Sequence, residues 1–302
     1  MTKQRLSIAW WGALVLTEFV ILWGAVVRAT GSGAGCGANW PSCNGEIIPL
    51  GSSTETLIEF THRVTSGIAL MAIVLLWWLG RNVLEGLAAR GARWSVVFIV
   101  IEAIIGAGLV LFEWTGTDAS VARAVAIAVH LSNTLLLLGA LTITASNANR
   151  SDESATRLQP PALVKVGLVA VLVVAAAGAV TALGDTLFPA ESLSDGLRQD
   201  LSASSSFLVN LRVIHPVLAV GVAGFVIWVT QRFRDGAPRL ATSVIVVVGL
   251  QVLAGFVNVA LLAPVWMQVV HLLLADVLWI AMVLFALALS RSTAKSAVSV
   301  NA

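Results

Sequence analysis

The chain has 302 residues, of which 58% are hydrophobic and only 11% are charged, and its formal net charge is +2. Soluble domains carry about 25% charged residues, so this composition excludes an ordinary soluble globular protein. The small net charge gives no sign of nucleic-acid binding. We therefore expect an all-α integral membrane protein.

The apolar segments have the length that a membrane helix needs, about 20 residues for a hydrocarbon layer about 30 Å thick. The first segment is longer than the apolar core of a signal peptide, so we expect it to be retained as a span. The sequence predicts eight transmembrane helices, at 8–28, 58–79, 94–114, 122–146, 163–184, 207–230, 240–262 and 266–290.

Basic residues are distributed unevenly between the two sides of the predicted bundle. Most of the 18 Lys and Arg residues lie near the termini or in the loops on the same side as the termini. Because cytoplasmic loops carry an excess of Lys and Arg, we expect both termini to be cytoplasmic. The remaining basic residues fall on the outer side and need another explanation: Arg28, Arg63, Arg123, Arg198 and Arg212.

A polar segment at 147–162 divides the chain into halves at 1–146 and 163–302, and we expect it to be a cytoplasmic linker. Four helices per half predict a parallel duplication into two four-helix bundles. Helix glycines are expected to serve helix packing or to leave room for a flat ligand. The halves share these features in the same order: Gly24-Ala25-Val26 with Gly178-Ala179-Val180, Glu102 and Gly106 with Gln251 and Gly255, and His130-Leu131 with His271-Leu272.

The four histidines of the chain are His62, His130, His215 and His271, one near the start of each even-numbered predicted helix. These helices run in one direction, so the imidazoles are expected at a similar depth below the outer face. An ionisable side chain inside a bilayer is costly and indicates function by default. Two imidazoles per bundle suit a haem iron better than zinc, which takes three or four protein ligands. A proton relay or structural hydrogen bonding is the alternative.

Two kinds of charged residue accompany the histidines. Glu59 lies one helical turn before His62 and shares its face, so it could orient the imidazole or move protons, or it could be a solvated carboxylate at the helix mouth. Arginines at the outer rim could bind haem propionates bidentately or extend to lipid headgroups. These possible propionate contacts are Arg28, Arg63, Arg123 and Arg212.

Three carboxylic acids, Glu18, Glu102 and Asp276, fall deeper in the predicted helices. Buried carboxylates can conduct protons, but protonated or hydrogen-bonded packing residues are an equal alternative. Gln251 replaces Glu102 in the second half. We therefore expect all three to lie outside the site.

Both cysteines of the chain, Cys36 and Cys43, fall in the first outer loop. The exterior is oxidising, so we expect a disulfide, with a redox-active pair as the alternative. Neither cysteine can be a thiolate ligand to a haem inside the bundle.

The outer loop and the helix after it carry a combination of motifs that resembles the haem A synthase family. The motifs are Val27-Arg28-Ala29-Thr30-Gly31-Ser32-Gly33, then Cys36, Trp40-Pro41 and Cys43-Asn44-Gly45, and then Glu59-Phe60-Thr61-His62-Arg63. With eight spans and four histidines, the resemblance covers nearly the whole chain. One departure is His215-Pro216 in the second half, where the first half has His62-Arg63.

The resemblance implies an enzyme that oxidises a methyl substituent of haem O to a formyl group by successive hydroxylation. It implies that His62 and His130 hold the substrate haem, that Glu59 is needed for catalysis, and that His215 and His271 bind the iron of a haem b cofactor. The first half would then hold the substrate and the second half the cofactor.

The resemblance also implies partners: haem O, haem O synthase and terminal oxidase assembly factors, in the lipid of the cell membrane and without nucleic acid. Two other functions stay open. An electron-transfer cytochrome b would carry electrons without changing a porphyrin, and a haem carrier or exporter would only bind it. Product analysis separates these functions from a synthase.

Overall fold

The computed structural model describes residues 2–49, 52–150, 158–202 and 204–300, and of 293–300 only the backbone. Within these ranges the chain forms helices and loops and no β-strand, which confirms the all-α prediction. Part of the expected linker, residues 151–157, lies outside the described residues.

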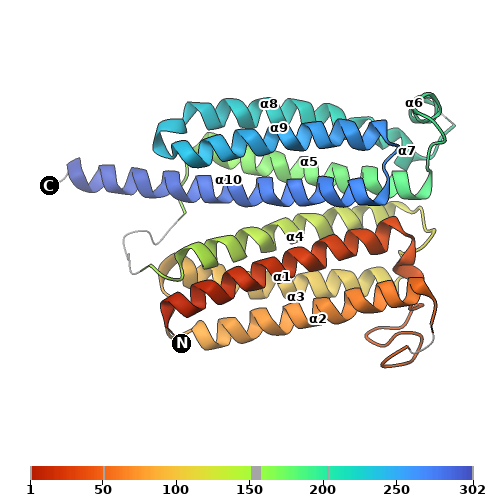
Figure 1. The fold of residues 1–302 in the computed structure, drawn as a ribbon, viewed down its shortest axis with the longest axis horizontal. Helices are drawn as coiled ribbons and strands as arrows, with labels where there is room; N and C mark the ends of the chain where they lie inside the picture. The colour runs from red at the N-terminus through yellow and green to blue at the C-terminus, as the bar shows by residue number, and fades with distance from the viewer. Residues whose placement is uncertain (1, 50–51, 151–157, 203, 301–302) are drawn as a thin grey trace.

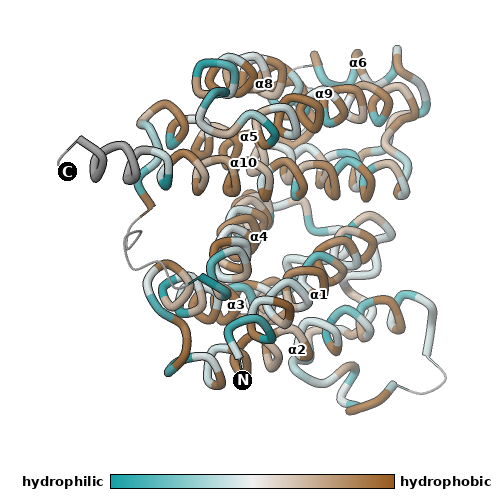
Figure 2. The backbone as a smooth tube through the Cα atoms, turned by 60° about the vertical axis from the view of Figure 1, so that its left-hand side comes forward, coloured by the Kyte–Doolittle hydropathy of each residue, from teal (hydrophilic) through white to brown (hydrophobic). Residues whose placement is uncertain are grey.

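Eight of the described helical segments are long and apolar enough to cross a membrane, as the sequence predicts. Two consecutive helices, α7 and α8, together form the sixth span. The helices are α1 Lys3–Ala29, α2 Thr54–Gly80, α3 Gly86–Leu111, α4 Val121–Asn147, α5 Ala162–Leu187, α6 Leu193–Leu201, α7 Phe207–Leu211, α8 Ile214–Arg232, α9 Pro238–Ala260 and α10 Val265–Val300. Apolar residues dominate the long helices in Figure 2.

Side-chain caps fix where two of the four helices that carry histidines begin, α2 and α4. The hydroxyl of Ser53 accepts a hydrogen bond from the backbone N–H of Thr56 at the start of α2. Ser120 does the same for Arg123 at the start of α4. A cap of this kind satisfies one of the four free N–H groups at a helix start, and so it sets the depth of every residue further along.

The long helices form two groups that lie one above the other in Figure 1. Helices α1 to α4 contact one another, and α5, α8, α9 and α10 make a corresponding set of contacts. The groups meet along α1, α4, α5 and α10. Both termini lie at one end of the molecule, while α6 lies at the other. This grouping follows the predicted division of the chain.

Helices α3 and α9 end in the same unusual way. Glu113 and Leu262 follow these helices with φ of 56° and 60°, in the left-handed region that residues other than glycine rarely adopt. In both cases the next N–H bonds the carbonyl five residues earlier at 2.8 Å. Such matched ends support the duplication, which itself stays a prediction.

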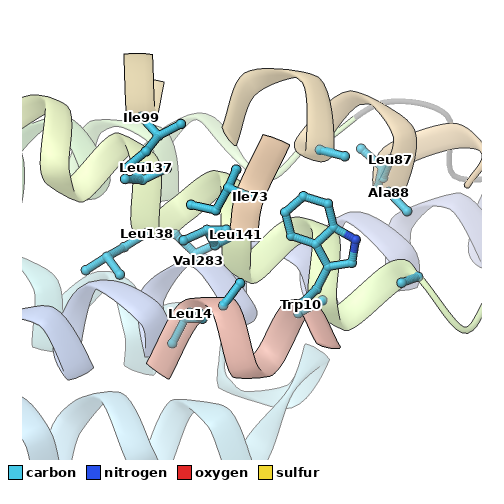
Figure 3. Close-up of a cluster of buried hydrophobic side chains, with 14 of the residues drawn as sticks. Trp10, Leu14, Ile73, Leu87, Ala88, Ile99, Leu137, Leu138, Leu141 and Val283 are labelled. Carbon is cyan, nitrogen blue, oxygen red and sulfur yellow. The ribbon is translucent and has the colours of Figure 1, made fainter. Parts of the chain in front are cut away.

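The largest apolar cluster fills the end of the first group near the N-terminus. Trp10, Ile73, Leu138 and Leu141 are fully or almost fully buried in it, and Val283 of α10 joins them (Figure 3). Side chains therefore fill this end of the bundle, and the helices with histidines begin at the opposite end.

Candidate functional site

All four histidines line one cavity of about 1420 Å³ that extends through the interior of both helix groups. Typical small-molecule pockets measure about 300–1,000 Å³, so this one has room for more than one drug-sized group. The sequence predicts a separate pair of histidines in each half. The structure instead joins both pairs in a continuous and mostly apolar space.

His215 and His271 face each other with ring centroids 6.4 Å apart and ring planes at 88°. Two imidazoles bound to opposite sides of one metal ion have centroids about 6.3 Å apart, given metal–nitrogen bonds of about 2.1 Å. The Nδ1 atom of His215 lies 3.2 Å from the carbonyl oxygen of Val174. A carbonyl only accepts, so Nδ1 carries the proton and the lone pair of Nε2 is left for a metal.

Three of the four imidazoles pack directly against a glycine on a neighbouring helix. A Cβ atom at these positions would come within 2.9, 2.8 and 3.2 Å of a ring carbon, closer than ordinary contact. The glycines therefore leave space for the rings. The pairs are Gly24 with His62, Gly178 with His215, and Gly255 with His271.

From the sequence, Gly24 and Gly178 are only matching positions of the predicted duplication, and their contact with the imidazoles was not predicted. The signal in the sequence was that Gly24 and Gly178 occupy matching positions. Each lies in the predicted helix before one that carries a histidine, His62 or His215. Periodicity alone could not separate such a glycine from one that serves helix packing, because which neighbour it faces depends on the tertiary contacts.

Glu102 lies in the cavity beside His130, which contradicts our expectation that it lies outside the site. Its Oε1 atom is 3.2 Å from Nδ1 of His130, although the two are not aligned as a hydrogen bond. The Asn133 amide and the Thr134 hydroxyl donate to the same carboxylate. The expectation failed because α3 packs closely against α4, a contact that the sequence does not reveal.

Glu59 is buried, with 3% of its surface exposed, so it is not a solvated carboxylate at a helix mouth. Its Oε2 atom accepts a hydrogen bond from the Cys36 backbone N–H at 2.8 Å, and Oε1 accepts from Nε of Arg63 at 3.1 Å. Nδ1 of His62 has no partner within the described part of the chain. Glu59 therefore holds the outer loop and Arg63, and it does not orient His62 through Nδ1.

Cys36 and Cys43 form the expected disulfide. The loop that it closes is tied to the second helix by Arg63, whose Nη1 donates to the carbonyls of Asn39 at 2.6 Å and Ser42 at 2.8 Å. With the bond from Cys36 to Glu59, this places the disulfide loop directly over the carboxylate and the arginine that line the cavity.

Arg28 bridges the two helix groups. It leaves the end of α1 and donates to the carbonyl of Ala182 at 2.7 Å and the hydroxyl of Thr186 at 2.8 Å, both on α5. It also donates to the amide oxygen of Gln268 at 2.8 Å, one turn before His271 on α10. A contact with a propionate stays a prediction for this residue.

Two further arginines are held inside the protein, which contradicts the alternative that they extend to lipid headgroups. Arg123 is 4% exposed and donates to the carbonyls of Gly116 and Asp118. Arg212 is 7% exposed and donates to the carboxylate of Asp200 at 2.9 Å. Both line the cavity, and a guanidinium has five N–H donors, so a propionate contact stays a prediction.

Glu18 and Asp276 face each other where α1 meets α10, outside the residues that line the cavity. Asp276 is fully buried, and the two carboxyl groups can hydrogen-bond only to each other within the described residues, with a proton on one of them. In the predicted duplication, Asp276 corresponds to Leu135 and Glu18 corresponds to Leu172. These two leucines lie where α4 meets α5, in the largest apolar cluster. Packing alone therefore does not require the two carboxyl groups.

The donor set suits a haem. Among the described residues, no three His, Cys, Asp or Glu side chains gather as a metal site. Zinc would need three or four such ligands. A haem iron takes its equatorial nitrogens from the porphyrin and needs only axial ligands from the protein. Imidazole pairs in an apolar cavity, with one Nδ1 fixed by a carbonyl, meet that requirement.

Comparison with known proteins gives a match over nearly the whole chain. The COX15-CtaA family model, described as a cytochrome oxidase assembly protein, matches residues 7–283. A protein of Thermus thermophilus named protoheme IX farnesyltransferase is 47% identical over 292 residues, which make up 94% of this chain and 48% of that protein. The chain thus spans about half the length of this relative.

Two shorter matches carry another name. A heme A synthase of Alkalihalophilus pseudofirmus is 42% identical over 95 residues, which make up 31% of this chain and 32% of that protein. A heme A synthase of an Exiguobacterium species is 35% identical over 169 residues, or 55% of this chain and 54% of that protein.

Proposed function

Since this chain belongs to the COX15-CtaA family of cytochrome oxidase assembly proteins and resembles the heme A synthases within it, we propose that it oxidises a methyl substituent of haem O to a formyl group. The reaction proceeds by successive hydroxylation. The observation that carries the proposal is one apolar cavity lined by two pairs of histidines.

In the C-terminal group, His215 and His271 hold haem b as the cofactor. Their ring separation of 6.4 Å and the carbonyl that fixes Nδ1 of His215 support this role. Bound haem b supplies a one-electron redox centre, while the protein supplies ligands, position and electrostatics. Gly178 and Gly255 give both rings the space that ligation requires.

In the N-terminal group, His62 and His130 hold haem O, the substrate. Arg63 and Arg123 line the outer part of the cavity and keep N–H donors for propionates, and Arg28 does so where the groups meet. Arg212 also lines the cavity, but its guanidinium bonds to Asp185, Phe188, Gln199 and Asp200. The cavity walls are mostly apolar, which suits the porphyrin and excludes water from the reacting carbon.

Glu59 moves protons in this reaction. Counted against water as the oxygen source, conversion of a methyl to a formyl group releases four protons, and it gives four electrons to an external electron acceptor. Glu59 is a buried carboxylate that lines the cavity, under a loop at the outer end of the helices. The Cys36 backbone N–H and the Arg63 side chain donate to this carboxylate, so they hold it at the boundary between the cavity and the outer loop.

The site faces the outer side of the cell membrane, and both termini are cytoplasmic. The four histidine helices start at the end of the molecule where α6 and the disulfide loop lie, away from the termini (Figure 1). Basic residues concentrate on the terminus side, in agreement with the positive-inside rule.

A haem farnesyltransferase, haem O synthase, supplies the substrate. This chain matches somewhat less than half of a relative that is named for farnesylation of protohaem. The product leaves for terminal oxidase assembly, as the family description suggests. Both transfers involve an apolar haem, so they take place within the membrane lipid.

The decisive experiment measures the haems extracted from cells that make haem O, with and without this chain. Formyl haem should appear only with the chain, and its absence would reject the synthase function in favour of a cytochrome or a haem carrier. Glu59→Gln should lower conversion by about 10²–10⁴-fold, since general acid–base groups contribute that much. Glu59→Asp should retain part of the activity.

The matched control is Glu46→Gln, which removes an exposed carboxylate from the same outer loop. It should convert haem O normally. The haem b content of the Glu59→Gln variant should be unchanged because that site lies in the other helix group. Near-normal conversion by Glu59→Gln would reject the catalytic role of Glu59 and leave the synthase function standing.

A further inference from the structure

We propose that Glu102 is a positioning residue for the haem site of the N-terminal group. Its carboxylate accepts the Nδ1 proton of His130 and makes that imidazole a more electron-rich iron ligand than its counterpart, His271. The inference rests on the proposed function, because it takes both histidines as haem ligands.

The contacts of Glu102 keep its carboxylate beside the ring. Oε1 lies 3.2 Å from Nδ1 of His130 and accepts from the hydroxyl of Thr134. Oε2 accepts from the amide of Asn133, which also donates to the carbonyl of Phe98 on α3. With both oxygens acting as acceptors, a small rotation of the ring aligns Nδ1–H on Oε1. Nε2 is then left for iron.

Glu102 and the two residues that donate to its carboxylate are all replaced in the second half. At the positions that the predicted duplication aligns, the second half has an amide in place of the carboxylate and two apolar residues in place of its two donors. Apolar side chains cannot hold a buried carboxylate, which needs donors to offset its desolvation. The replacements are Gln251 for Glu102, Leu274 for Asn133 and Ala275 for Thr134.

His130 is also the one histidine of the four without a close glycine contact. At Gly106, the position aligned with Gly255, a Cβ would meet nothing within 4 Å, whereas Gly255 lies against the ring of His271. The space around His130 is open, so packing does not fix its ring. The carboxylate of Glu102 is the group that can do so.

A carboxylate acceptor on the second ring nitrogen raises the basicity of a ligating imidazole. His215 uses a neutral backbone carbonyl for this purpose. Nδ1 of His271 has no partner among the described residues, because the amide of Gln251 lies 3.4 Å from the other ring nitrogen, Nε2. Hydrogen bonding to an axial ligand is one of the means by which a protein sets the potential of a haem. The iron held by His130 should therefore have the lower reduction potential.

The test replaces Glu102 and measures potentials rather than turnover. Purified protein is loaded with haem, and each haem is titrated spectroscopically and by electron paramagnetic resonance of its ferric state. A His215→Ala background assigns the signal of the N-terminal haem. Glu102→Gln should shift the potential of that haem upward and leave the C-terminal haem unchanged.

Two controls separate the possible causes. Glu113→Gln removes a carboxylate from the loop after α3 and should change neither potential. Glu102→Asp keeps the charge but withdraws it from the ring, so it should give a smaller upward shift. If Glu102→Gln does not accumulate, the Glu102→Asp variant decides, and no upward shift there overturns the proposal.

An unchanged N-terminal potential in Glu102→Gln, or an equal shift at both haems, would overturn the positioning role and leave the proposed function intact. If the unaltered protein binds no haem through His62 and His130, the proposed function fails, and this inference fails with it.

Discussion

Gly178→Ala should displace His215 from the position in which it can bind iron. The new Cβ would lie 2.8 Å from Cε1 of the imidazole, whereas ordinary contact begins at 3.4 Å. The ring must therefore move by about 0.6 Å, slightly more than the tolerance of about 0.5 Å for a functional site. The same movement strains the 3.2 Å contact between Nδ1 and the carbonyl of Val174.

Loss of such a supporting contact typically lowers metal affinity by about 10–100-fold, so we expect a drop of that size in haem b affinity for Gly178→Ala. The assay titrates haem into the purified variant and follows the low-spin spectrum. Gly167→Ala is the matched control, because it lies on the same helix and its Cβ would be at an ordinary 3.5 Å from Met282. Equal haem affinity in both variants would refute the idea that Gly178 positions the ring.

Three further outcomes are expected. His215→Ala should remove the low-spin haem b spectrum, and an unchanged haem content would refute its role as a ligand. Replacing both Glu18 and Asp276 with leucine should raise the thermal unfolding temperature, since one hydrogen bond between two buried carboxyl groups does not offset their desolvation; a lower temperature would refute this reasoning. Replacing Cys36 and Cys43 with serine should destabilise the outer loop by about 2–3 kcal/mol, measured as faster proteolysis of the loop, because the disulfide no longer restricts the unfolded chain.

Much of the architecture could be predicted from local sequence. Eight apolar segments predicted eight spans, and all eight are present among the described helices. Among the helix starts, the difference is largest for the third span, where α3 starts at Gly86, before the predicted start at 94. Arg90 and Arg93 belong to this first part of the helix, where hydropathy gives no signal although the backbone is helical.

The disulfide could also be predicted, because two cysteines in one outer loop leave a single partner for each. The role of Glu59 could be predicted only in part. Its spacing from His62 indicated a shared helix face, but not that its hydrogen bonds go to Arg63 and Cys36. Those partners come from a loop whose path the spacing does not determine.

The sequence by itself determined which residues lie in the membrane and at what depth, since hydrophobicity and helical rise are local properties. It therefore placed all four histidines at one level. Only the tertiary structure decided which side chains meet at that level: Glu102 beside His130, a glycine under each of three rings, and Arg28 across the two groups. In lipid the apolar surfaces of all the helices are nearly equivalent, so helix pairing depends on close packing and hydrogen bonds between distant residues. Those contacts have no local signal in the sequence.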